Sequence, residues 1–153
     1  MSTTFKISDA AAIALHAAVL LAARRGGLLN AGEISKALAI SEAHLVKVLQ
    51  RLTRAGIVAP ERGRRGGYRL VRPPAGITLQ EVYEAIEGRM TVEICLFRRK
   101  ICKRRPCILH GLIRDINKRA LNYFHETTLD NLAEEEKKSA GRPAAEEQTR
   151  QRS

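Results

Sequence analysis

The stretch that decides the fold, residues 41–72, reads SEAHLVKVLQRLTRAGIVAPERGRRGGYRLVR. Its first half predicts a helix from about Glu42 to Ala55, with Ser41 as the N-cap and Gly56 as the C-terminal stop. The apolar positions of this helix recur at helical spacing and are expected to face the core. They are Leu45, Val48, Leu49 and Leu52.

The second half of the stretch predicts a β-hairpin. Two short apolar segments, residues 57–59 and 68–71, flank the sequence RGRRGG at residues 62–67. Glycine adopts the positive φ angles that a hairpin tip requires. The arginines between the glycines leave this tip strongly cationic.

The preceding segment completes a helix-turn-helix. Residues 30–33, NAGE, have the form of a capping box and open a short helix to about Ala39. An Ala- and Leu-rich helix from about Ser8 to Arg25 stands before it and stops at glycines. A second capping box, Thr78 to Glu81, starts a helix that closes at Gly88. The expected fold is mostly α with a small β-hairpin wing, a winged helix-turn-helix.

A long helix is predicted from Cys107 to about His125. Its apolar residues alternate four and three positions apart, a coiled-coil-like seam that typically packs on a second subunit. The seam consists of Leu109, Ile113, Ile116, Ala120 and Tyr123, widened by Leu112 and Phe124. A short capped turn follows at residues 128–132, and the polar residues after it are expected to be disordered.

These features divide the chain into four parts. We expect residues 1–88 to form a winged-helix domain, which the basic residues considered below indicate as the DNA-binding part, and residues 89–106 to form a cysteine-bearing loop. We expect residues 107–133 to form a dimerisation helix with the capped turn, and residues 134–153 to form a disordered tail.

The composition points to a polyanionic partner. The 153 residues carry a formal net charge of +11, with a pI near 10.2. The excess is concentrated at residues 47–72 and 92–107, and a basic excess of this kind in a soluble chain favours nucleic acid. Apolar runs stay short of the ~18 residues that a membrane span needs, and the N-terminus lacks the pattern of a signal peptide. We therefore expect a cytoplasmic protein without a membrane partner.

The helix-turn-helix and wing supply the candidate DNA contacts. A recognition helix reads base edges from its N-terminal turns in the major groove, and the residues expected there are Ser41, Ala43, His44 and Lys47, with Arg51 one turn further. Lys47 and Arg51 could equally bind phosphates. The wing arginines have a natural target in a narrow A·T minor groove, and they are Arg62, Arg64 and Arg65. An ordinary basic α+β domain is the alternative, but the ordered combination of elements favours DNA binding.

Three cysteines and a histidine form a compact candidate metal site, Cys95-x6-Cys102-x4-Cys107-x2-His110. An odd number of cysteines in a reducing compartment argues against a disulfide framework. Cations favour the thiolate form, which ligates metal, and six interleave the set: Arg98, Arg99, Lys100, Lys103, Arg104 and Arg105. The spacing differs from the Cys-x2-Cys pairs of structural zinc sites and leaves room for an iron–sulfur cluster with mixed Cys and His ligation. Unliganded cysteines and a redox disulfide are the alternatives.

The chain resembles the Rrf2 family of bacterial winged-helix regulators. The resemblance lies in residues 52–58 (LTRAGIV), the wing 62–68 (RGRRGGY), and ITL at 77–79 before AIEG at 85–88. The cysteine set and residues 108–115 (ILHGLIRD) resemble the family's iron–sulfur members, which regulate cluster biogenesis. In all, the similarity covers about residues 5–132.

The resemblance implies a homodimer with crossing long helices and a 2Fe–2S cluster near the dimer interface. It implies Cys95, Cys102 and Cys107 as thiolate ligands and His110 as the fourth ligand. Other members take a carboxylate from the first helix, where this chain has Ala12, and this difference favours His110.

We therefore expect a sequence-specific transcriptional regulator that binds palindromic double-stranded DNA and depends on an iron–sulfur cluster. A thiol-redox or zinc-dependent member of the same family without a cluster is one alternative. A small basic RNA-binding protein is another, although the low aromatic content of 4% leaves few stacking platforms for RNA bases. The sequence shows no Ser/His/Asp set, paired-carboxylate site or phosphate-binding loop, so we do not expect an enzyme.

Overall fold

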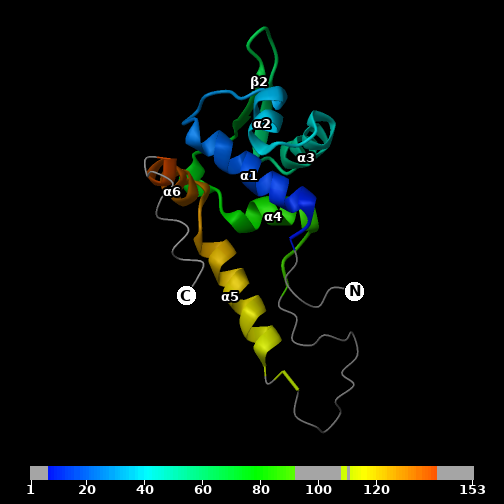
Figure 1. Ribbon diagram of the computed structural model, residues 1–153, viewed down its shortest axis with the longest axis vertical. Coiled ribbons are helices and arrows are strands. Elements are labelled where there is room, and N and C mark those ends of the chain that lie inside the picture. The colour runs from blue at the N-terminus through cyan, green and yellow to red at the C-terminus, as the bar shows by residue number, and fades with distance from the viewer. Residues whose placement is uncertain (1–6, 92–107, 110, 141–153) are drawn as a thin grey trace.

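The computed structural model describes residues 7–91, 108–109 and 111–140. Three helices, α1 (Asp9–Ala23), α2 (Ala31–Leu38) and α3 (Glu42–Arg54), precede an antiparallel hairpin of β1 (Val58–Glu61) and β2 (Gly67–Leu70). A 3-10 turn, η1 (Pro74–Gly76), leads into α4 (Leu79–Glu87), and α5 (Leu112–Glu126) and α6 (Leu129–Ala140) follow. Figure 1 shows α5 extending away from the domain, while α6 lies beside α1. The predicted winged helix-turn-helix is confirmed.

The predicted capping residues fix the helix starts. The Asn30 side chain accepts a hydrogen bond from the Glu33 N–H, and the Glu33 carboxylate accepts one from the Asn30 N–H, both at 2.8 Å. Ser41 caps α3 by accepting from the His44 N–H at 3.3 Å. These bonds satisfy backbone donors that the first helical turn leaves without partners. The two helices of the helix-turn-helix therefore begin where the sequence predicts.

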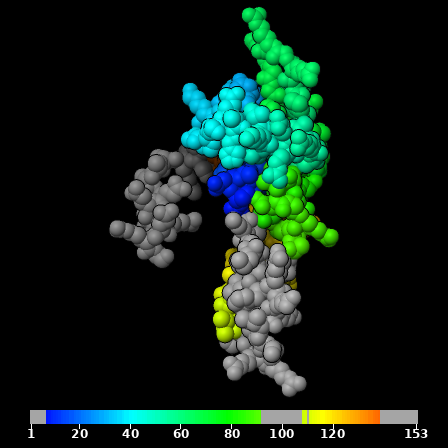
Figure 2. Space-filling view, turned by 90° about the vertical axis from the view of Figure 1, so that its right-hand side faces the viewer, coloured from blue at the N-terminus to red at the C-terminus, as the bar shows by residue number. Residues whose placement is uncertain are grey.

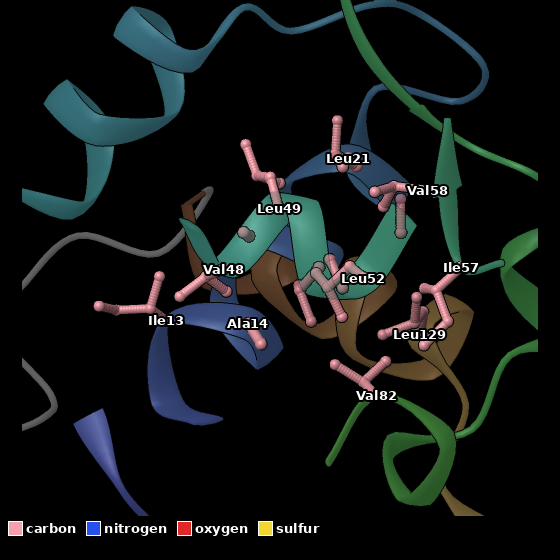
Figure 3. Close-up of a cluster of buried hydrophobic side chains, with 14 of the residues drawn as sticks. Ile13, Ala14, Leu21, Val48, Leu49, Leu52, Ile57, Val58, Val82 and Leu129 are labelled. Atoms are coloured by element: carbon pink, nitrogen blue, oxygen red, sulfur yellow. The ribbon is translucent and has the colours of Figure 1, made fainter. Parts of the chain in front are cut away.

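The core lies between α1, α3, α4 and the start of α6. The buried face of α1 is rich in alanine, and this helix packs mainly against α4 and α6. Leu52 of α3, Val82 of α4 and Leu129 of α6 are fully buried and meet in one cluster, as Figure 3 shows. Because the apolar face of α3 is occupied by the core, its opposite face is left for solvent or a ligand.

The C-terminal end of α5 is anchored to α4. The Leu79 N–H donates to the Thr127 carbonyl, and the Leu129 N–H donates to the Ile77 carbonyl, both at 2.9 Å. The rings of Tyr83 and Phe124 meet edge to face, with centroids 5.5 Å apart. These contacts fix the direction in which α5 leaves the domain.

Two predictions about the C-terminal half are wrong. The long helix begins at Leu112 rather than Cys107, because Ile108 and Leu109 form a turn and Gly111 takes a φ of 85°. The predicted capped turn at 128–132 is the start of α6, so the disorder expected from residue 134 does not apply through Ala140. The sequence of α6 is mostly polar, but Leu129 and Ala133 lie on one side of the helix and are buried. Residues 141–153 lie outside the described residues.

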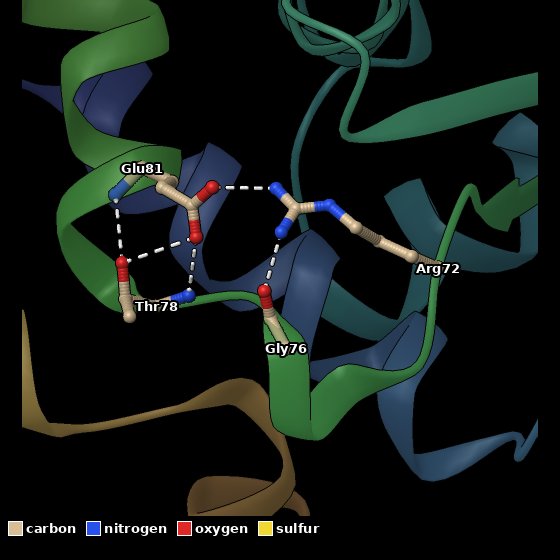
Figure 4. Close-up of polar contacts among 4 residues, drawn as sticks. All are labelled: Arg72, Gly76, Thr78 and Glu81. Atoms are coloured by element: carbon tan, nitrogen blue, oxygen red, sulfur yellow. Dashed lines mark hydrogen bonds and ion pairs between the residues drawn. The ribbon is translucent and has the colours of Figure 1, made fainter.

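An ion pair ties the end of the hairpin to the start of α4. The Arg72 guanidinium contacts the Glu81 carboxylate and the Gly76 carbonyl, while Glu81 also forms the capping box with Thr78 (Figure 4). Partial burial by itself would raise the pKa of Glu81. The Thr78 N–H and the Arg72 guanidinium outweigh that effect, so the pKa of Glu81 lies below its ordinary value.

Replacing Arg72 by methionine is expected to move the pKa of Glu81 upward, because the guanidinium favours the carboxylate. A carboxyl group with a lowered folded-state pKa stabilises the fold above its unfolded pKa, about 4.3, and loses this contribution as the pH falls through the folded-state pKa. Arg72→Met should therefore lose less stability on acidification, while costing up to about 1 kcal/mol at pH 7. NMR titration of Glu81 and urea unfolding check this result, with Arg89→Met as control. An unchanged Glu81 pKa in Arg72→Met would contradict it.

Candidate nucleic-acid interface

The helix-turn-helix presents one face of α3 to solvent. Helices α2 and α3 are joined by residues 39–41, where Ala39 takes a left-handed φ of 53°. The predicted reading positions of this element are all exposed: Ser41, Ala43, His44 and Lys47. The structure thus brings these four residues together on the surface opposite the core.

Two further residues belong to the exposed face of α3. Gln50 and Arg54 are exposed and continue the line of Ala43 and Lys47 at steps of three and four residues. Side chains at this spacing share one side of a helix. The helical period of the polar positions identifies both residues, whereas the predicted contacts are confined to the first turns of the helix and Arg51.

The wing is held by close backbone contacts. Tyr68 and Leu29 exchange two backbone hydrogen bonds, at 2.8 and 3.2 Å, which attach β2 to the chain before α2. A Cβ atom on Gly67 would lie 2.6 Å from the Leu29 carbonyl oxygen, so this position accepts only glycine without a shift of the backbone. The hairpin tip projects from the domain next to α2 (Figures 1 and 2).

The basic side chains of this region divide into two groups. Arg69 pairs with Glu61, Arg72 pairs with Glu81, and Arg51 donates to the backbone carbonyl of Ile86. The second group is exposed and has no hydrogen bond or ion pair to the described part of the chain. It comprises Lys47, Arg54, Arg62, Arg64 and Arg65. These cations on α3 and the wing form a surface suited to a phosphate backbone.

The candidate metal ligands Cys95, Cys102, Cys107 and His110 lie outside the described residues. The described helix α5 begins at Leu112, after both residues, so the expectation that Cys107 and His110 share a helix face stays a prediction. Within residues 7–91, 108–109 and 111–140, no group of three or more His, Cys, Asp or Glu side chains could hold a metal ion.

The predicted seam of α5 is divided between two faces. Ile113 and Phe124 are buried, at 9% and 6% exposed. Leu112, Ile116 and Tyr123 are 52%, 43% and 53% exposed and lie along another side of the helix. These three residues, the α5 stripe, form an exposed apolar surface, in which the Tyr123 ring contacts Phe124 at a centroid distance of 6.3 Å.

Comparison with known proteins identifies the family. A family model described as an iron-dependent transcriptional regulator, Rrf2, matches residues 7–135. The chain belongs to the Rrf2 family. This Rrf2 protein is 34% identical over 121 residues to the HTH-type transcriptional regulator NsrR of Bacillus subtilis, across 78% of this chain and 82% of NsrR. It is 31% identical over 100 residues to the HTH-type transcriptional regulator IscR of Vibrio atlanticus, across 65% of this chain and 58% of IscR.

A solved structure supports the same assignment. CymR, the global cysteine regulator of Bacillus subtilis, superposes on this Rrf2 protein with a TM-score of 0.73 at 28% identity. The match covers 86% of this chain and 98% of CymR. The protein is therefore a DNA-binding transcriptional regulator, and these relatives are regulators rather than enzymes. Across the described helices, none combines the length and hydropathy required to cross a bilayer.

Proposed function

We propose that the protein binds a palindromic operator as a homodimer and that an iron–sulfur cluster controls this binding. The observation that carries the proposal is the donor set Cys95, Cys102, Cys107 and His110, which lies between α4 and α5 in a chain matched by an iron-dependent regulator family. The ligand chemistry agrees, since thiolate and imidazole are the ligands of mixed iron–sulfur centres.

The DNA contacts follow from the exposed surface of α3 and the wing. Ser41, Ala43 and His44 are exposed and would face base edges in the major groove, and the exposed Lys47 would contact a phosphate about one turn later. The guanidinium groups at the hairpin tip enter the adjacent minor groove, where a narrow A·T tract attracts cations. They belong to Arg62, Arg64 and Arg65.

The α5 stripe supplies the proposed dimer interface. Large exposed apolar side chains aligned on one helix are covered by a second subunit in many symmetric oligomers. A symmetric dimer carries one helix-turn-helix per chain, so its two recognition helices enter major grooves about one helical turn, ~34 Å, apart. A palindromic operator matches this symmetry.

The cluster-binding loop, residues 89–106, would link the cluster to DNA binding through its place in the chain. It joins the end of α4 to the segment before α5, and therefore connects the winged-helix domain to the proposed dimer helix. When bound, an iron–sulfur cluster would supply one-electron redox chemistry, and the protein side chains would supply its ligands. A neutral imidazole from His110 among thiolates makes ligation sensitive to protonation at this position.

Anaerobic purification of the full chain tests the proposal. Visible absorption, with iron and inorganic sulfide counted per chain, supports the cluster. A colourless protein that contains zinc, or one with no metal and a reversible disulfide, supports the cluster-free alternatives. Footprinting then shows whether the protected DNA contains two symmetric half-sites.

Arg62→Ala is expected to reduce the preference for A·T base pairs at the wing position. Loss of the minor-groove guanidinium should weaken operator binding by roughly 1–3 kcal/mol, with a smaller effect on random DNA. Arg69→Ala is the matched control, because Arg69 lies in the same hairpin and is paired with Glu61. Affinity measured on operators with A·T or G·C at the wing position checks the prediction. Equal losses on operator and random DNA would count against a minor-groove role.

A further inference from the structure

Arg51 makes a contact that its predicted phosphate-binding role does not explain. Its guanidinium donates a hydrogen bond to the backbone carbonyl of Ile86, in the last turn of α4. The last four carbonyls of a helix have no partner within that helix. A cation at this end is also favoured by the helix dipole. Arg51 of α3 therefore acts as a C-terminal cap for a different helix.

The end of α4 is a junction of several elements. The Ser8 hydroxyl, which caps α1, also donates to the Glu87 carboxylate. The Glu84 carboxylate accepts from the Met90 N–H and from the Gln80 side chain, both at 2.9 Å. Arg51 adds the contact from α3, so α1, α3 and the chain that leaves α4 all meet at one helix end.

The surrounding packing explains why a directional bond matters here. Val48 and Leu52 of α3 and Val82 and Ile86 of α4 are buried in the common core. The hydrophobic effect is non-directional, so burial of apolar surface does not by itself select one orientation of a helix. A hydrogen bond has a narrow range of distance and angle, so the Arg51 contact fixes how α3 sits against α4.

The neighbouring cations behave differently. Lys47 and Arg54 lie on the same helix within about one turn of Arg51, and neither has a hydrogen bond or ion pair to the described residues. They are available to a phosphate without breaking any internal contact. A phosphate contact by Arg51 would have to share or break its bond to Ile86.

We propose that Arg51 is a positioning residue, which sets the angle at which α3 enters the major groove and does not serve as a phosphate ligand. The proposal rests on α3 being the recognition helix, as proposed above. It revises the expectation from sequence that Arg51 binds phosphate as Lys47 does.

Salt dependence of DNA binding separates the two roles. The probes are a duplex selected from a random library by the wild-type protein and a scrambled duplex of the same composition. Arg51→Met should leave the salt slope unchanged and lower the ratio of specific to scrambled affinity on the order of tenfold, the value of a misplaced base contact. Lys47→Met is the reference, and should lower the slope by about 0.9 for each phosphate that Lys47 neutralises, with the ratio unchanged.

The other outcomes are equally distinct. If Arg51→Met lowers the salt slope and leaves the ratio of specific to scrambled affinity unchanged, Arg51 is a phosphate ligand and the proposal is overturned. If neither Lys47→Met nor Arg51→Met changes either quantity, α3 is not the recognition helix, and the proposed DNA contacts fail together with this inference. If Arg51→Met does not fold, Arg51→Lys decides. A lysine keeps a point charge for a phosphate but not the guanidinium geometry. The proposal therefore predicts that Arg51→Lys lowers the ratio of specific to scrambled affinity and leaves the salt slope unchanged. If Arg51→Lys retains the wild-type affinity ratio and the wild-type salt slope, the proposal is overturned.

Discussion

Protein purified anaerobically with serine at Cys95, Cys102 or Cys107 is expected to be colourless, with iron and sulfide near zero. Each substitution removes one of three thiolates, and a serine hydroxyl does not replace an anionic sulfur ligand at neutral pH. Operator affinity should change in the same direction for all three variants, because each yields the same cluster-free protein. Visible absorption, metal counts and gel-shift titration measure these effects. A serine variant that retains a full cluster would remove that cysteine from the ligand set.

His110 can be tested against a matched control on the same chain. His110→Ala should leave a labile cluster, whereas His125→Ala should not affect it, because His125 lies at the end of α5 and contacts Gln80. His110→Cys should retain a cluster at lower potential, since an anionic thiolate replaces a neutral imidazole. If His110→Ala matches the wild type in spectrum, stability and potential, the fourth ligand is another group, and Asp9 of a second copy is the next candidate.

The parts of the fold that sequence predicts correctly are governed by local chemistry. The boxes at Asn30 and Thr78 and the cap at Ser41 involve residues three positions apart, so their pattern is visible in the sequence. The glycines that predict the hairpin are also close together in the sequence, so the hairpin is predicted from a local pattern. The exposure of His44 and Lys47 follows from the helical period of the apolar residues on the other face.

The parts that sequence does not predict depend on contacts between distant residues. The Arg51–Ile86 bond joins residues 35 positions apart, and no local pattern distinguishes Arg51 from Arg54. Helix α6 packs against α1 through Leu129 and Ala133, far from α1 in the sequence, and a polar composition does not reveal this packing. The predicted start of α5 is wrong because the left-handed conformation of Gly111 ends the regular helix there, and the apolar spacing continues across this boundary.

Ile116→Glu is expected to convert the protein to monomers at micromolar concentration and to abolish high-affinity operator binding. Ile116 lies in the middle of the α5 stripe, between Leu112 and Tyr123, and is 43% exposed in the single chain. A symmetric interface would bury this side chain twice, so the substitution places two unpaired carboxylates in it, at a cost of roughly 3–5 kcal/mol or more. Sedimentation velocity and operator titration measure the two effects.

The control for this substitution is Lys118→Glu, which changes an exposed residue of α5 outside the stripe. It should leave the protein dimeric, and its circular dichroism should match that of Ile116→Glu if both variants are folded. Because a monomer contacts one half-site only, Ile116→Glu should retain weak binding through α3 and the wing, with about half the salt slope of the wild type. A dimeric Ile116→Glu protein would show that the subunits associate through another surface. A wild-type monomer that protects single half-sites would contradict the dimer altogether.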